Sequence, residues 1–292
     1  MPSREPPAFD LVVATVDRAE ELRRLFASFE RQNHPSLRVL VVDQNDDDRL
    51  ARVLAESSKL DLVHLRAPRG LSRARNAALP HLRGDVVGFP DDDCEYPDGL
   101  LERVATRLAE SERLDGLTGR AADESGRSSR SWRRDRALLT SGDLWNRAIS
   151  FAIFLRRTIV EQVGRFDEEL GLGSGRPWES GEEIDYLVRA VRAGARIEYD
   201  PELVVLHPQK QHSTLELRSI AFRDGASVGY ILRKHGYDAR TTARMLVRPL
   251  GGAGVSLLRG DAARAGFHLA TLQGRLAGYR SRPGNSGRRV TC

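Results

Sequence analysis

Short apolar runs alternate with helical patterns through about the first hundred residues of the chain. Four runs with the character of buried strands occur at residues 9–15, 37–42, 60–65 and 86–89. Helical patterns lie between them; in residues 19–31, for example, leucine and phenylalanine recur every three or four positions. Strands that alternate with helices pair in parallel, because each helix crosses over the sheet to the start of the next strand. The sequence therefore predicts an α/β fold with a doubly wound, mainly parallel central sheet flanked by helices.

Three consecutive carboxylates, Asp91, Asp92 and Asp93, follow the fourth of these runs. Adjacent anions repel one another, so the folded chain must offset them with a cation, protons or solvent. Residues just past the carboxyl end of a parallel strand lie where open α/β sheets bind ligands. Hard oxygen ligands of this kind suit Mg2+ or Mn2+, which are commonly shared with substrate phosphates. The triplet alone fits a solvated acidic turn equally well.

Other polar residues follow predicted strands in the same way. Asp43 ends the second strand, where a carboxylate is well placed for the ribose or base of a nucleotide, or simply begins a polar loop. Arg75 lies in a helix that follows Gly70, and a helix N-terminus with a nearby arginine favours phosphate, although arginines on helices are more often solvated. His207 follows the predicted strand at residues 203–206, and only its surroundings could make it a ligand.

An acidic first turn opens a helix predicted to begin near Gly181. Glu182, Glu183 and Asp185 would interact favourably there with the positive end of the helix dipole, an arrangement that is common without catalysis. Asp185 lies four residues before Arg189, so the two side chains could pair on the helix surface. From the residues alone, a structural role explains this turn well.

The second half of the chain differs in character from the first. Residues 115–143 are rich in glycine, serine and arginine, and we expect a mobile loop beside the site there. The strand pattern stops past residue 215, and helical patterns follow at residues 216–235, 239–247 and 262–279. The predicted division is an α/β domain at 1–214, a helical extension at 215–280 and a disordered tail at 281–292.

Composition narrows the class of protein. A hydrophobic content of 40% and a charged content of 30% describe a soluble globular chain, and no apolar run is long enough to span a bilayer. The N-terminus has no apolar signal core, and two cysteines, Cys94 and Cys292, make no disulfide framework, so we expect a cytoplasmic, reducing location. The net charge of +5 permits anionic lipid or phosphorylated ligands. Nucleic acid is not expected, because no basic stripe with interleaved aromatic residues is present.

Taken together, these segments resemble the family 2 glycosyltransferases of the GT-A fold. The motifs that carry the resemblance are, in order, VVATVDRAEELRRLFASF, VLVVDQN, RGLSRARNAAL, FPDDDC, and ESGEEIDYLVRAVRAG with EYDPELVVLHP. They extend from about residue 10 to residue 208. The resemblance implies a Rossmann-like GT-A domain at residues 1–214. It also implies hexosyl transfer, with inversion, from a nucleoside-diphosphate sugar to an acceptor hydroxyl.

The resemblance also implies a role for each motif residue. An Mn2+ or Mg2+ ion would be bound by Asp91, Asp93 and His207. The nucleotide sugar would be contacted by Thr15, Asp17, Asp43, Arg75, Asp91 and Asp92. By motif position the catalytic base is Glu183, with Glu182 beside it and Asp185 as the alternative. Trp178 would lie on the acceptor side.

Two other classes of protein compete with this interpretation. A sugar-nucleotide nucleotidyltransferase would be expected to carry a glycine-rich phosphate loop after the first strand, but residues 12–18 contain no glycine. A non-catalytic nucleotide-binding module at a membrane surface is the other alternative. The arginine-rich helices beyond residue 215 could pack on the core or lie on an anionic membrane at its inner face. A saccharide or lipid-linked acceptor, for cell-envelope polysaccharide or glycolipid, is therefore a reasonable expectation.

Overall fold

The computed structural model describes residues 5–128 and 131–281. The chain divides into two compact units. The first comprises the chain up to Phe166 together with Glu183–Gln209, and the second comprises Asp167–Glu182 and the chain from Lys210 onward. Apart from Ser281, the tail predicted at residues 281–292 lies outside the described residues.

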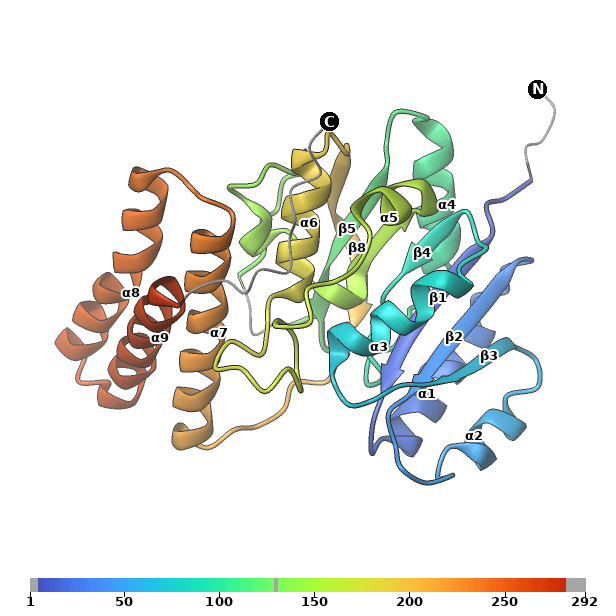
Figure 1. Cartoon of the computed structure of the whole chain (residues 1–292), viewed down its shortest axis with the longest axis horizontal. Helices are drawn as coiled ribbons and strands as arrows, with labels where there is room; N and C mark the ends of the chain where they lie inside the picture. The colour runs from blue at the N-terminus through green and yellow to red at the C-terminus, as the bar shows by residue number, and fades with distance from the viewer. Residues whose placement is uncertain (1–4, 129–130, 282–292) are drawn as a thin grey trace. The chain divides into compact units, whose positions relative to one another are not determined.

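The first unit is built on one mixed sheet, in the order β3-β2-β1-β4-β7-β5-β8-β6 among the residues described (Figure 1). Its strands are β1 (Phe9–Thr15), β2 (Leu37–Asp43), β3 (Asp61–Arg66), β4 (Val86–Gly88), β5 (Gly116–Ala122), β6 (Ala137–Leu138), β7 (Ile153–Arg156) and β8 (Ile197–Leu206). Strands β1 to β4 pair in parallel as expected, whereas β7 runs antiparallel between β4 and β5. The predicted α/β fold is confirmed.

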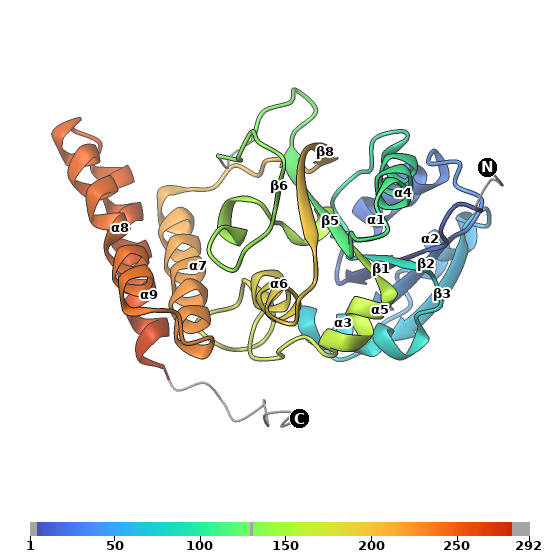
Figure 2. The same ribbon diagram turned by 90° about the horizontal axis from the view of Figure 1, so that it is seen from above.

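Helices cover both faces of this sheet. They are α1 (Ala19–Glu30), α2 (Ala51–Glu56), α3 (Leu71–Ala78), α4 (Leu100–Glu110), α5 (Arg157–Val163) and α6 (Glu182–Arg192). Helices α1 and α4 lie on one face, and α3 and α5 lie on the other (Figure 2). The central strands are therefore buried on both sides, which explains why residues 39–42 of β2 form a continuous apolar run rather than an alternating one.

The carboxyl ends of three parallel strands converge at one edge of the sheet. Thr15 at the end of β1 is in register with Asp43 at the end of β2. The backbone of Asp91, just past β4, forms a parallel bridge with Ala14 of β1. The fold therefore brings the polar residues that follow these strands to the same edge, as the topology of open α/β sheets requires.

A buried carboxylate ties the opposite end of the sheet together. Asp10, which is 1% exposed, accepts hydrogen bonds from Nε and Nη2 of Arg38 in β2, at 2.9 and 2.8 Å. It also accepts from the backbone N–H groups of Arg83 and Gly84 before β4, at 2.5 and 2.8 Å. Burial opposes the charged form, but these hydrogen bonds outweigh it and hold the pKa of Asp10 below its ordinary value.

Strands β5 and β6 lie within residues 115–143, so the prediction of one long mobile loop there is wrong at residues 116–122 and 137–138. β5 pairs with β7 on one side and with β8 on the other. Gly119 of β5 is required by the close approach of β8, because a Cβ there would lie 2.1 Å from the carbonyl oxygen of Leu203. β-propensity does not reveal a strand whose glycine serves this purpose.

The second unit consists mainly of three helices, α7 (Thr214–Lys234), α8 (Ala239–Leu258) and α9 (Ala262–Arg280). The predicted helical extension is present. Helix α9 packs against both α7 and α8. Glycines allow the backbones of α7 and α9 to touch, because a Cβ on Gly229 would lie 2.0 Å from the carbonyl oxygen of Arg275. Among the described residues, no helix is both long and apolar enough to cross a membrane.

Helix α8 continues eleven residues past the predicted end at Val247, through Pro249. Proline has no N–H to donate to the carbonyl four residues earlier, which normally breaks or kinks a helix. Here Nη1 of Arg275 in α9 donates a hydrogen bond to that carbonyl, on Met245. Burial, with Arg248 nearby, lowers the pKa of Arg275 to about 10, so the guanidinium remains cationic at neutral pH.

Candidate active site

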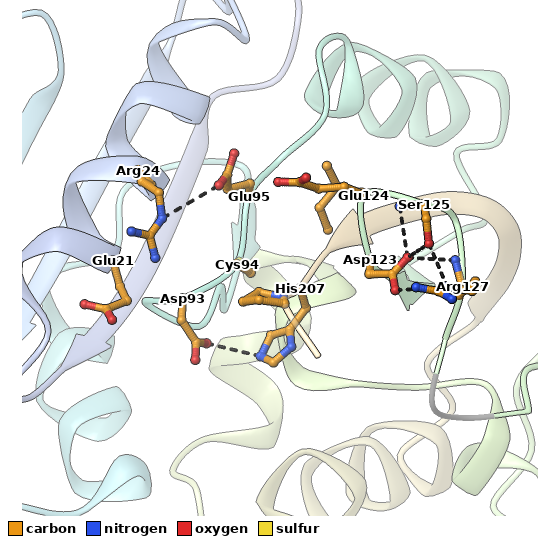
Figure 3. A pocket seen from close by; sticks show the side chains of 12 residues that line it. Glu21, Arg24, Asp93, Cys94, Glu95, Asp123, Glu124, Ser125, Arg127 and His207 are labelled. Carbon is orange, nitrogen blue, oxygen red and sulfur yellow. Dashed lines mark hydrogen bonds and ion pairs between the residues drawn. The ribbon is translucent and has the colours of Figure 1, made fainter. Parts of the chain in front are cut away.

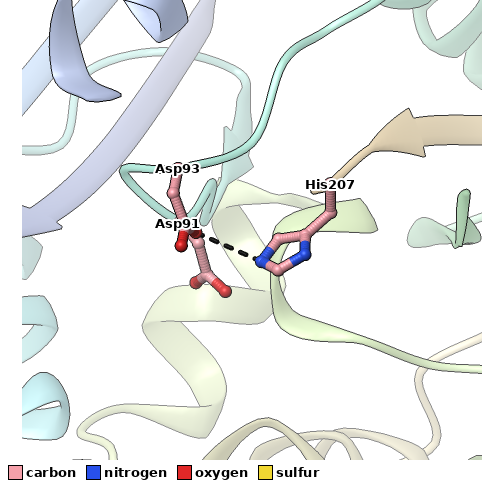
Figure 4. A group of neighbouring side chains, drawn as sticks. All are labelled: Asp91, Asp93 and His207. Atoms are coloured by element: carbon pink, nitrogen blue, oxygen red, sulfur yellow. Dashed lines mark ion pairs between the residues drawn. The ribbon is translucent and has the colours of Figure 1, made fainter. Parts of the chain in front are cut away.

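The residues expected to hold a metal ion lie together. Asp91 and Asp93 follow β4, and His207 follows β8; each offers a ligand atom, and these atoms lie within 4.8 Å of one another (Figure 4). Oδ1 of Asp93 is 3.2 Å from Nε2 of His207, whose ring stacks on Phe151. Two carboxylates and one imidazole can bind Mn2+ or Mg2+. The donor set therefore fits the ion that the sequence predicts.

Arg75 is buried beside this group rather than solvated. Its side chain is 1% exposed and lies over the rings of Phe89 and Phe166, at 5.9 and 5.5 Å from their centroids. Its Nη2 lies 3.3 Å from Oδ1 of Asp91, which also accepts from the hydroxyl of Ser150 at 3.2 Å. A buried guanidinium aimed at a carboxylate is a specific arrangement, since an arginine is almost never fully buried unless it is paired.

Glu183 faces the same residues from α6. A small cavity is lined by Glu183, Arg75 and Ser150, together with Phe89, Ile153, Phe166 and Tyr186. Since both Arg75 and Ser150 contact Asp91, the structure places Glu183 on the Asp91 side of the acidic triplet. Glu183 is therefore the carboxylate of the first turn of α6 that lines a cavity with the residues that contact Asp91.

The two alternative acids of α6 lie in different surroundings. Asp185 is fully buried, and its Oδ2 accepts a hydrogen bond from Nε of Arg189 at 3.1 Å. The predicted pairing of these two residues is therefore present, but Asp185 is buried rather than at the helix surface. Glu182 is also buried and belongs to the second unit. Neither residue lines the small cavity that contains Glu183.

Arg18, which the sequence analysis did not single out, contacts the acidic triplet. Its Nη1 lies 2.6 Å from Oδ1 of Asp92 and 2.9 Å from Oδ2 of Asp93. Burial raises the pKa of the Asp92 carboxyl, and Arg18 opposes this effect. The guanidinium of Arg18 therefore offsets part of the repulsion predicted among the three adjacent aspartates. The parallel pairing of β1 with β4 brings the two segments together.

Residues expected to contact the nucleoside lie at the ends of β1 and β2. Asp43 is buried; its Oδ1 accepts from the backbone N–H of Asn45 at 2.9 Å, and its Oδ2 lies 3.1 Å from Nε2 of His64. Asp17 adopts a left-handed backbone, with φ 61°, and its N–H donates to Oδ1 of Asn45 at 2.8 Å. Such a conformation is uncommon outside glycine and is tolerated best by Asn and Asp. Asn45 thus links Asp17 to Asp43, beside the buried Thr15.

A larger cavity, of about 470 Å³, opens beside the Asp93–His207 pair (Figure 3). Glu21 and Arg24 of α1 contribute to one wall, and residues 123–127 after β5 contribute to another. Asp91 and Glu183 do not line this cavity; Asp93 is the residue of the triplet that does. Asp93 of the metal group thus faces the open cavity, whereas Glu183 lines a separate small one.

Trp178 lies in the second unit, within which its ring stacks on that of Tyr230 with a centroid distance of 4.8 Å. Its indole Nε1 is buried and has no hydrogen-bond partner among the described residues. The stacking on Tyr230 explains a tryptophan at this position by its packing within the second unit. Its expected place on the acceptor side remains a prediction.

The sequence model described as glycosyl transferase family 2 matches residues 10–164, more than half of the chain. The chain belongs to this family. The match covers the strands that carry Thr15, Asp43 and the acidic triplet, and it ends before α6.

Curated relatives of this family member are distant. The chain is 26% identical over 242 residues to the pre-mycofactocin glycosyltransferase of Mycobacterium tuberculosis, which covers 76% of this chain and 47% of that protein. It is 21% identical over 229 residues to glycosyltransferase AglE of Haloferax volcanii, covering 75% and 72%. The chain thus spans about half the length of the first of these relatives.

Solved structures share its fold. The mannosyltransferase PcManGT from Pyrobaculum calidifontis, in complex with GDP-Man and Mn2+, superimposes with a TM-score of 0.65 at 15% identity, over 93% of this chain and 87% of that one. Residues 1–349 of TarS from S. aureus, in complex with UDP-GlcNAc, superimpose with a TM-score of 0.59 at 18% identity, over 91% and 90%. The GT-A fold expected for this family member is confirmed.

Proposed function

We propose that this family member is a metal-dependent, inverting hexosyltransferase that moves a sugar from a nucleoside-diphosphate sugar to an acceptor hydroxyl. The observation that carries the proposal is the position of Asp91. It belongs to the group of metal-binding donors, and it contacts Arg75 and Ser150, which line a cavity with Glu183. A metal-bound diphosphate held at Asp91 would therefore lie beside a carboxylate that could serve as the base.

Asp91, Asp93 and His207 would hold the Mn2+ or Mg2+ ion. When bound, such an ion supplies positive charge that offsets the charge developing on a leaving diphosphate. The structural neighbour whose complex contains GDP-Man and Mn2+ supports this assignment. Arg75, with its buried guanidinium, would add a fixed cation beside Asp91, where it stabilises negative charge on the phosphates.

Glu183 would act as the catalytic base. The acceptor oxygen forms a bond to the anomeric carbon while the bond from that carbon to the diphosphate oxygen breaks, and the hydroxyl proton passes to the Glu183 carboxylate. Attack on the face opposite the leaving group inverts the anomeric carbon, which carries oxocarbenium character in the transition state. Asp185 is the less suitable base because it is buried against Arg189.

The ends of β1 and β2 would bind the nucleoside. Thr15 and Asp43 are buried at these ends, and Asp17 is linked to Asp43 through Asn45. A carboxylate in the position of Asp43 can accept hydrogen bonds from the ribose or the base. Asp92, held by Arg18, would border the donor site.

The arginine-rich helices bear on the acceptor and the location. We propose a saccharide or lipid-linked acceptor in the synthesis of cell-envelope polysaccharide or glycolipid, with Trp178 on the acceptor side. Structural neighbours solved with GDP-Man and UDP-GlcNAc support a nucleotide-sugar donor. A cytoplasmic protein that contacts the inner face of an anionic membrane peripherally is consistent with the arginine-rich helices.

A donor screen tests the reaction. The full chain is mixed with UDP-, GDP- and dTDP-sugars and Mn2+, and donor binding is followed by thermal shift while hydrolysis and transfer are followed by mass spectrometry. Glu183→Gln should lower turnover about a hundred-fold or more, as expected for loss of a general base, while leaving the thermal shift with donor in place. Glu110→Gln, on the exposed end of α4, is the matched control.

Two results would contradict the proposal. Unchanged turnover in Glu183→Gln would show that Glu183 is not the catalytic base. Release of pyrophosphate from a nucleoside triphosphate and a sugar 1-phosphate would instead identify a nucleotidyltransferase.

A further inference from the structure

Helix α8 exposes large apolar side chains along one face. Val247, Leu250, Val255, Leu257 and Leu258 are 52, 49, 48, 62 and 90% exposed, respectively, and we call these five residues the α8 face. They share one side of the helix, as spacings of three, eight, ten and eleven residues from Val247 require. The opposite side, which includes Thr242, Pro249, Ala253 and Ser256, is buried.

The charge around this face has one sign. Four exposed arginines flank or precede it in the sequence: Arg240, Arg244, Arg248 and Arg259. No acidic residue occurs between Ala239 and Leu258. The nearest carboxylates, Asp238 and Asp261, instead cap the N-termini of α8 and α9 through hydrogen bonds to backbone N–H groups. An apolar strip bordered by arginines, without acidic neighbours, is therefore the feature to be explained.

We propose that the α8 face binds an anionic lipid surface, with α8 lying in the plane of the headgroups. This proposal deepens the membrane contact that forms part of the proposed function by naming the surface that makes it. The apolar side chains would enter the boundary between headgroups and acyl chains, and the arginines would reach the lipid phosphates.

A second copy of the chain fits this face less well. A two-fold interface brings a patch against itself, so the row of arginines on α8 would face an identical row. Like charges brought together in this way repel, and no carboxylate of α8 is available to relieve the repulsion. An anionic surface complements both the charge and the apolar strip.

The test is co-sedimentation of the full chain with vesicles of phosphatidylcholine alone, or of phosphatidylcholine mixed with phosphatidylglycerol. We expect binding to the anionic vesicles only, weakened by salt. Each arginine near an anionic surface strengthens binding about fivefold, so Arg244→Gln, Arg248→Gln and Arg259→Gln together should weaken it about a hundred-fold. The pair Leu257→Ser and Leu258→Ser should weaken it about tenfold or more.

A control variant with the same change in charge carries Arg52→Gln, Arg103→Gln and Arg113→Gln, all at exposed positions of the first unit. It should bind vesicles like the wild type, and melting curves of all variants should coincide. The proposal is overturned if the full chain ignores anionic vesicles, or if the control variant loses as much binding as the α8 variant. A solution dimer that Leu257→Ser and Leu258→Ser dissociate would also overturn it. Vesicle binding requires no turnover, so an inactive Glu183→Gln variant that still binds vesicles separates this proposal from the proposed reaction.

Discussion

Replacing Gly229 by alanine tests whether backbone contact holds the helical unit together. An alanine Cβ there would lie 2.0 Å from the carbonyl oxygen of Arg275 and 2.6 Å from the backbone nitrogen of Tyr279. The first distance falls 1.0 Å short of the 3.0 Å that real Cβ contacts respect, and the opposing atoms are backbone, which cannot rotate away. Helices α7 and α9 must therefore move apart along their contact.

The expected cost follows from two opposing effects. Overpacking against a rigid neighbour costs roughly 3 kcal/mol or more. Alanine has a higher helix propensity than glycine, which offsets about 1 kcal/mol. The free energy of unfolding of the helical unit should therefore fall by about 2 kcal/mol or more. Urea denaturation of the full chain, followed by circular dichroism, measures this change.

Gly251→Ala is the matched control for this experiment. Gly251 is also inside a helix, α8, but a Cβ there would meet no atom within 4 Å. The same substitution should therefore raise stability, by up to about 1 kcal/mol. If Gly229→Ala proves as stable as Gly251→Ala, the backbones of α7 and α9 are not in contact and the reasoning fails.

Two further predictions concern charged residues of the first unit. Arg18→Gln removes a guanidinium that contacts Asp92 and Asp93. Calorimetry without nucleotide should therefore show Mn2+ binding about two- to fivefold more tightly, which corresponds to the free energy of a half-exposed ion pair. Weaker binding would refute competition between Arg18 and the ion. Asp10→Asn should lower the free energy of unfolding by about 2–4 kcal/mol at neutral pH, because the Arg38 guanidinium loses its buried partner. The folded-state pKa of Asp10 lies below the ordinary 3.8, so its contribution to the free energy of unfolding is complete above pH 3.8 and is lost as the pH falls further. The difference in stability between wild type and Asp10→Asn should therefore disappear in acid. A difference that does not change with pH would contradict this assignment.

Local pattern was enough to predict the first four strands and the position of the acidic triplet. Strands β1, β2 and β4 are mostly buried, so most of their residues are apolar, and the helices between successive strands indicate parallel pairing. Strand β5 could not be predicted in the same way. Glycine is required at position 119 because the backbone of β8, more than eighty residues later in the sequence, lies too close for a side chain. Short-range propensity carries no information about such a contact.

The tertiary contacts of individual side chains explain why their roles in the candidate site could not be predicted from the sequence. Arg75 and Arg18 look alike in the sequence, as arginines within or just before a helix, yet one is buried against two phenylalanine rings and the other is half-exposed on two aspartates. Likewise, the position of Glu183 in a cavity with Arg75 depends on tertiary packing that brings α6 near Phe89 and Ile153. Charge pattern predicts that carboxylates need cations, but the tertiary fold decides which cation each one meets.

The hydrogen bond from Arg275 to the carbonyl that Pro249 leaves unbonded has a consequence for α8 as a whole. Val247 precedes the proline and Leu258 follows it, so the two side chains point the same way only while the helix stays continuous across that position. The alignment of one helix thus depends on a cation supplied by its neighbour. Without the guanidinium, α8 would be expected to kink at Pro249. The residues of the α8 face before and after the proline would then point in different directions.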